Sequence, residues 1–176
     1  MNILIVGCGR TGRRRVPALR ARGPQVAGLA RDRPALEERA AALGLAAPAA
    51  VFAGMAAPEE VPLYYRLGDV FVSASSSETQ GLTYLEALAA GTPAVCLADP
   101  CLNGVIENGV NGWQYETGRE RDEELNRLLT DEPLRKWLAR GAAAGAAAFS
   151  EEAFGEKVLA LYEARRAAKA RRGGAV

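Results

Sequence analysis

Residues 75–93, which read SSSETQGLTYLEALAAGTP, connect two apolar runs of the chain. The runs are residues 69–73 before the stretch and residues 93–97 at its end, and both are typical of buried strands. Residues 82–90 are rich in helix-forming side chains and end at a Gly-Thr-Pro helix stop. The order strand, loop, helix, strand predicts one unit of a parallel α/β sheet.

Polar residues gather where the strand of this unit ends and its helix begins. In open α/β sheets, ligands bind at the carboxyl ends of the strands. Free backbone N–H groups at a helix start can hold a phosphate, and a carboxylate one turn into the helix can accept hydrogen bonds from sugar hydroxyls. Glu78 and Glu86 stand eight positions apart across this junction. The junction therefore predicts a nucleotide-sugar site.

The rest of the chain alternates apolar runs with helix-forming segments. Further strands are predicted at residues 2–6, 25–29, 49–53 and 113–115. Further helices are predicted at residues 11–22, 33–43, 57–66, 120–129, 132–149 and 151–172. We expect an α/β fold with a doubly wound, Rossmann-like parallel sheet flanked by helices, and a helical C-terminus. The 176 residues suit one domain, 1–176, in which residues 150–176 form a helix with a basic tail.

Composition excludes several classes of function. The net charge of +1 argues against a general nucleic-acid binder. The sequence has no histidine, so Ser-His-Asp, Cys-His and zinc–histidine chemistry are excluded within this chain. Its three cysteines form no CxxC pair and suit a reducing compartment. No segment approaches the ~20 apolar residues of a membrane helix, and we expect a cytoplasmic protein.

A glycine-rich motif follows the first predicted strand. It reads Gly7-Cys-Gly9-Arg-Thr-Gly12 and matches the dinucleotide-binding fingerprint. That fingerprint also needs an acidic residue at the end of the second strand, where this chain has Arg31 followed by Asp32. A structural turn explains the glycines equally well. The NAD(P)-binding Rossmann domain of an oxidoreductase is therefore the alternative function.

A more specific signal lies in residues 71–116. The segment 77–93 and the run ENGVNG at 107–112 resemble the C-terminal, donor-binding domain of GT-B-fold retaining glycosyltransferases of family four (glycosyl transferases group 1). The similarity extends more loosely over residues 2–165. It is greatest to members that build glycolipids or cell-wall polymers in bacteria.

The resemblance implies roles for the residues of the junction. Glu78, as a catalytic residue, would contact hydroxyls of the transferred sugar or support developing charge near its anomeric carbon. Backbone amides around Gln80, Gly81 and Leu82, with Thr79 beside them, would hold the diphosphate. Glu86 would accept hydrogen bonds from the ribose hydroxyls. The structural alternatives are that Glu78 caps the helix and that Glu86 faces solvent.

The resemblance also implies that basic residues after the first strand neutralise the diphosphate. Arg10 fits the arginine of the family's pattern, and Arg14 or Arg15 would replace its lysine. We expect Arg10 and Arg15 to act in catalysis and Gly9 and Arg14 to contribute to donor binding. An exposed basic patch at residues 13–15 is an equally good reading.

Other residues near the expected site have simpler roles. Gly104 stands where many members of the family carry glutamate, so this chain departs from their pattern there. Tyr64 and Tyr65 are expected to pack rather than to contact an acceptor. Asn108 and Asn111 are expected to shape turns by adopting the left-handed conformation.

These observations together favour a donor domain that binds a nucleotide-diphosphate sugar, with a UDP-hexose as the expected donor. The reaction would be retaining hexosyl transfer to a glycolipid or cell-wall acceptor. Turnover would need a separate N-terminal acceptor domain or subunit. No cofactor or metal is expected, because arginines and amides would stabilise the departing diphosphate. The expected partners are the nucleotide sugar and, peripherally, the inner face of the membrane, but no nucleic acid. A third reading is a non-catalytic module that binds a partner through the basic tail, 165–172.

Overall fold

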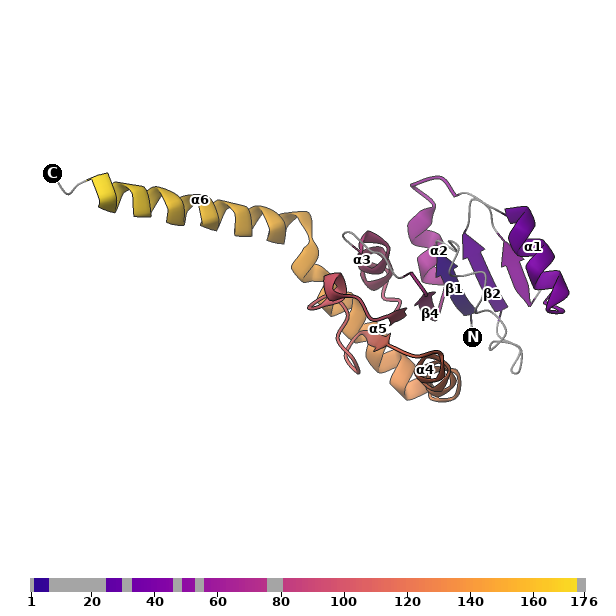
Figure 1. Cartoon of the computed structure of the whole chain (residues 1–176). Coiled ribbons are helices and arrows are strands. Elements are labelled where there is room, and N and C mark those ends of the chain that lie inside the picture. Colours follow the sequence, from indigo (N-terminus) through magenta and orange to yellow (C-terminus); the bar gives the residue numbers. More distant parts are fainter. Residues whose placement is uncertain are drawn as a thin grey trace.

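The structure is a computed structural model that describes residues 2–6, 25–29, 33–45, 49–52, 56–75 and 81–173. Within these residues one sheet of six parallel strands has the order β3-β2-β1-β4-β5-β6 (Figure 1). The strands are β1 (Asn2–Val6), β2 (Gln25–Leu29), β3 (Ala50–Phe52), β4 (Val70–Ser73), β5 (Ala94–Leu97) and β6 (Gly112–Tyr115). The predicted doubly wound parallel sheet is thereby confirmed.

Helices connect most of the strands and form the C-terminal part of the chain. The α-helices are α1 (Arg33–Ala42), α2 (Val61–Leu67), α3 (Leu82–Ala89), α4 (Gly118–Thr130), α5 (Glu132–Ala146) and α6 (Glu151–Gly173). The described residues also include the short 3₁₀-helices η3 (Pro100–Leu102) and η4 (Ala147–Phe149). The helix predicted at 11–22 lies outside the described residues.

Two predicted helix boundaries are wrong. α2 begins at Val61 rather than at residue 57, because residues 58–60 form a turn in which the Glu60 N–H donates to the Ala57 carbonyl. The acidic residues expected in the first helical turn therefore precede the helix. The helix predicted to run to residue 149 ends as an α-helix at Ala146 and tightens into η4.

The centre of the sheet is the pair β1 and β4. Ile3 lies opposite Val70 and Leu4 opposite Phe71, in parallel register. The chain first builds β2 and β3 on one side of β1, then returns to place β4 and β5 on the other. The strand order reverses between β1 and β4, and in open α/β sheets this switch point is where ligands bind.

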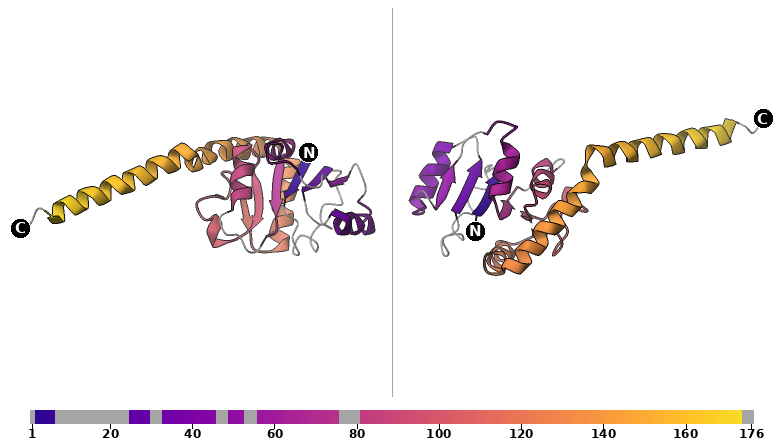
Figure 2. Two further views of the ribbon diagram at one scale, coloured as in Figure 1. Left: turned by 90° about the horizontal axis from the view of Figure 1, so that it is seen from above. Right: turned by 180° about the vertical axis from the view of Figure 1, so that it is seen from behind.

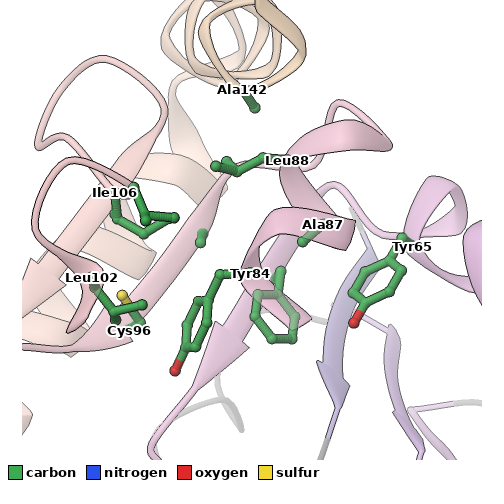
Figure 3. Close-up of a cluster of buried hydrophobic side chains, with 11 residues drawn as sticks. Tyr65, Tyr84, Ala87, Leu88, Cys96, Leu102, Ile106 and Ala142 are labelled. Carbon is green, nitrogen blue, oxygen red and sulfur yellow. The ribbon is translucent and has the colours of Figure 1, made fainter. Parts of the chain in front are cut away.

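The two faces of the sheet carry separate buried clusters. In β4, Val70 and Val72 belong to one cluster while Phe71 belongs to the other, as the two-residue period of a strand requires. In β5, Cys96 is buried (Figure 3) and belongs to the same cluster as Phe71. Because both faces of the sheet are buried, the sequences of its strands are continuous apolar runs.

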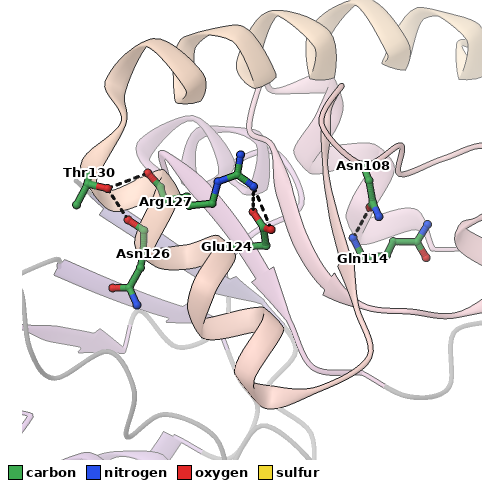
Figure 4. Close-up of polar contacts among 6 residues, drawn as sticks. All are labelled: Asn108, Gln114, Glu124, Asn126, Arg127 and Thr130. Carbon is green, nitrogen blue, oxygen red and sulfur yellow. Dashed lines mark hydrogen bonds and ion pairs between the residues drawn. The ribbon is translucent and has the colours of Figure 1, made fainter.

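α4 packs against β5 and β6 with polar contacts along its exposed edge. The Arg127 guanidinium lies 5.0 Å from the centroid of the Trp113 ring and pairs with the Glu124 carboxylate at 2.9 Å. Nearby, the Gln114 N–H donates to Asn108 Oδ1 at 2.7 Å (Figure 4). The Arg127–Trp113 contact joins α4 to β6, and the Gln114–Asn108 hydrogen bond joins β6 to the loop before it.

α6 runs away from the sheet, as Figures 1 and 2 show from three directions. Phe154, Leu159, Leu161 and Tyr162 are exposed on it. The basic side chains at 165, 166 and 169 are also exposed. None of the described helices has the length and apolar character that crossing a membrane requires.

Gly141 allows α5 to approach the loop before β6. A Cβ built on Gly141 would overlap the carbonyl group of Val110. The Trp137 indole N–H donates to the Gly109 carbonyl at 3.2 Å on the same side of the helix. By contrast, a Cβ built on Gly155 in α6 meets nothing within 4 Å.

We predict opposite effects for alanine at these two helical glycines. Gly141→Ala should lower the free energy of unfolding by about 1–3 kcal/mol, because the methyl group displaces α5 from the loop. Gly155→Ala should leave global stability unchanged or raise it by up to about 1 kcal/mol, since alanine favours the helix. Urea denaturation followed by circular dichroism measures both. Equal stability of the two variants would contradict the close packing at Gly141.

Candidate functional site

Two tyrosines hold the carboxyl end of β4. The Tyr84 hydroxyl, from α3, donates to Ser73 Oγ at 2.9 Å, and the Tyr115 hydroxyl, from β6, donates to the Ser73 carbonyl at 3.0 Å. The Ser75 N–H also donates to Ser73 Oγ, at 3.2 Å. Both tyrosines and Ser73 are buried. The strand end that precedes the expected diphosphate loop is therefore fixed by two neighbouring elements.

α3 begins on a glycine in the left-handed conformation. Gly81 has φ 62° and ψ 30°, and a Cβ there would lie 3.0 Å from Leu102 Cδ2. Only glycine takes this backbone geometry without strain. No side chain caps the helix start among the described residues. The first turn of α3 is joined to the carboxyl end of β4 by the Tyr84–Ser73 hydrogen bond, and the role predicted for the amides of Gly81 and Leu82 stays a prediction.

Glu86 lies on the exposed face of α3, four residues after the exposed Leu82. The Tyr65 hydroxyl of α2 donates to Glu86 Oε2 at 3.0 Å. Burial raises the pKa of Tyr65 above its usual value, and the Glu86 carboxylate raises it further. A cleft of about 290 Å³ adjoins this pair and is lined by Pro58, Val61, Pro62, Tyr65, Arg66, Glu86, Ala89 and Ala90.

The structure describes only part of the predicted site. Gly81, Leu82 and Glu86 are described, and all three belong to α3 or its N-cap. The remaining predicted site residues lie outside the described residues: Gly9, Arg10, Arg14, Arg15, Glu78, Thr79 and Gln80. The strands that precede them in the chain, β1 and β4, are neighbours in the sheet. The roles of these seven residues stay predictions.

The hydroxyl groups that hold the elements of the site together were not predicted from the sequence. Tyr65 is buried in the core, which confirms the expected packing role of its ring, yet its hydroxyl reaches Glu86. Ser73, Tyr84 and Tyr115 were not singled out. The available signal was a serine that ends an apolar strand, because a buried hydroxyl needs hydrogen-bond partners.

In the loop between η3 and β6, Asn108 and Asn111 shape turns as expected, but not through the backbone conformation that was predicted. Among the described residues positive φ occurs only at glycines, including Gly104 and Gly109 at 77° each. Asn111 shapes the turn through its side chain: Oδ1 accepts from the Glu107 N–H at 2.8 Å and Nδ2 donates to the Val105 carbonyl at 2.9 Å. Asn108 acts similarly, through Gln114. The left-handed conformation predicted for the two asparagines is therefore wrong.

Comparison with known proteins identifies the family. Residues 25–144 match the family model described as glycosyl transferases group 1. The chain belongs to this family. The match extends from β2 to α5 and includes the whole of the 75–93 stretch. It does not favour the alternative of an NAD(P)-binding oxidoreductase domain, whose motif at 7–12 lies outside both the match and the described residues.

Individual glycosyltransferases match over different lengths. The alpha-monoglucosyldiacylglycerol synthase of Streptococcus pneumoniae is 54% identical over 65 residues, 37% of this chain and 15% of that protein. The D-inositol 3-phosphate glycosyltransferase of Frankia alni is 36% identical over 160 residues, 85% of this chain and 38% of that protein. The Anabaena protein Alr3699/HepE, solved in complex with UDP, shares the fold: TM-score 0.79, 20% identity, 93% of this chain and 48% of that one. The chain spans less than half the length of each.

We predict that Tyr65 contributes to an alkaline loss of stability. Its pKa is raised in the folded chain, so above pH about 10 the unfolded chain releases a proton that the folded chain retains. This contribution to stability is complete below pH about 10 and decreases above it, by up to about 1.4 kcal/mol per pH unit. Denaturation at pH 8 to 11 should show a smaller alkaline decrease for Tyr65→Phe. The exposed-site control Tyr162→Phe retains the Tyr65 contribution, and identical slopes for the two variants would contradict the prediction.

Proposed function

We propose that this chain is the donor domain of a retaining hexosyltransferase that binds a UDP-sugar. The observation that carries the proposal is the position of Glu86. It lies one turn inside a helix whose start follows β4, at the point where the strand order reverses, and no described side chain caps that start. A carboxylate there can accept hydrogen bonds from ribose hydroxyls while the helix amides bind the diphosphate.

The relatives support the donor and acceptor classes. Alr3699/HepE was solved with UDP, and the same nucleotide is proposed here. The S. pneumoniae relative is named as a synthase of a glucosylated diacylglycerol, which supports a glycolipid acceptor. A cell-wall acceptor is the other member of the proposed class. With a lipid acceptor, transfer would occur at a membrane surface, and peripheral contact with the inner face of the membrane belongs to the proposal.

In the proposed reaction the bond between the anomeric carbon and the diphosphate oxygen breaks, the oxygen of an acceptor hydroxyl bonds that carbon with retention, and the hydroxyl proton passes to the departing diphosphate. Arg10 and Arg15 would neutralise the departing diphosphate, and Gly9 and Arg14 would contribute to its binding. Glu78 would position the sugar. The proposal includes no metal and assigns the acceptor to a separate N-terminal domain or subunit.

We predict that Glu86→Ala weakens UDP binding by about 10- to 100-fold, because a charged hydrogen-bond acceptor for the ribose is lost. Isothermal titration of the 176-residue chain with UDP and with UDP-glucose measures this directly. The control is Glu163→Ala, an exposed glutamate on α6, which should bind both ligands as the parent does.

Two results would count against the donor site. One is the absence of UDP binding by the parent chain. The other is UDP binding by Glu86→Ala with the affinity of the parent. Tight binding of NADPH in place of UDP would instead favour the alternative hypothesis, in which residues 7–12 bind a dinucleotide.

A further inference from the structure

Glu86 has a flexible side chain on an exposed helix face, and ligand selection there needs a fixed orientation. A free glutamate exchanges among several rotamers and loses their entropy when a ligand binds. In this chain Oε2 accepts the Tyr65 hydroxyl at 3.0 Å across the gap between α2 and α3. The carboxylate is therefore held from one side before any ligand arrives.

The donor of this hydrogen bond is itself rigid. The Tyr65 side chain is buried, with 1% of the residue exposed, and its ring meets Phe71 edge to face at 5.8 Å between centroids (Figure 3). The Thr92 hydroxyl donates to the Tyr65 carbonyl at 2.8 Å and fixes the backbone. Tyr65 thus carries a hydroxyl whose position is set by the core.

The geometry leaves one oxygen of Glu86 for a ligand. No hydrogen bond joins Oε1 to another described residue, and the carboxylate borders the cleft between α2 and α3. An ionised carboxylate only accepts hydrogen bonds, so its partner must be a donor. Ribose offers two hydroxyl donors, whereas a sugar without them offers none.

We propose that Tyr65 is a positioning residue that orients Glu86, and that the pair selects ribonucleotides over their deoxy counterparts. The inference rests on the proposed function, because it concerns the nucleotide of the same donor site. A site built to bond a hydroxyl discriminates against an analogue that lacks it, since the site's polar group is then left without its partner.

A purely structural role for Tyr65 makes a different prediction. In that case the hydrogen bond only satisfies a buried phenol, and its removal lowers stability by a similar amount with any ligand. The two roles are separated by comparing ligands that differ only in the ribose hydroxyls.

The experiment is isothermal titration of the full chain with UDP and with 2′,3′-dideoxy-UDP. The parent should prefer UDP by at least about tenfold. Tyr65→Phe should weaken UDP binding by about three- to tenfold and leave dideoxy-UDP binding nearly unchanged. The matched control is Tyr64→Phe, on the same helix, which should keep the parent's preference. In the Glu86→Ala background, Tyr65→Phe should have no further effect on UDP.

Glu86→Asp provides a second variant that leaves the core intact. It keeps the charge but withdraws the carboxylate from Tyr65. It should therefore lose the preference for UDP over dideoxy-UDP to a similar extent as Tyr65→Phe does. The inference is overturned if Tyr65→Phe keeps the parent's preference or weakens both ligands equally. If Tyr65→Phe does not fold, an unchanged preference in Glu86→Asp overturns it. Failure of the parent to bind UDP would overturn the proposed function itself, so the two failures are distinguishable.

Discussion

The parallel pairing and two-sided burial of β4 are the constraint on which the rest of the structure depends. β4 is hydrogen-bonded to β1 on one side and to β5 on the other. Its side chains alternate between the two core clusters, and Ser73 at its end receives hydroxyls from α3 and β6. The start of α3, and with it Gly81 and Glu86, is therefore tied to the centre of the sheet.

The fold was largely predictable because buried parallel strands are short apolar runs between turns. The strands observed at 70–73 and 94–97 lie within the predicted runs. The start of α2 was not predictable, since Pro58 and Pro62 can each stand in the first turn of a helix. The predicted end of α5 was wrong for another reason. Alanines favour helix equally at every position, so the change from α5 to η4 leaves no mark in the composition.

The candidate site also has parts that the local sequence predicts and parts that it does not. The start of α3 after Gly81, with Glu86 one turn inside the helix, was predictable because the helix and its Gly-Thr-Pro stop belong to one local segment. The bond from Tyr65 to Glu86 joins residues 21 positions apart, and the bond from Tyr115 to Ser73 joins residues 42 apart. Such pairs depend on how α2 and β6 are placed around β4, which no local pattern encodes. The family resemblance assigns roles to residues within motifs but carries no information on these supporting hydroxyls.

The attachment of α6 to the rest of the chain affects how the molecule unfolds locally. Its start is held to η4, where the Lys157 ammonium donates to the Ala148 carbonyl at 3.1 Å, and η4 is its principal neighbour among the described elements. Beyond that anchor its stability rests on the helix–coil equilibrium. Its amide protons should therefore exchange with solvent through local fraying, whereas those of β4 and β5 exchange only when the sheet opens. The chain thus combines a cooperative body with a helical arm that unwinds independently.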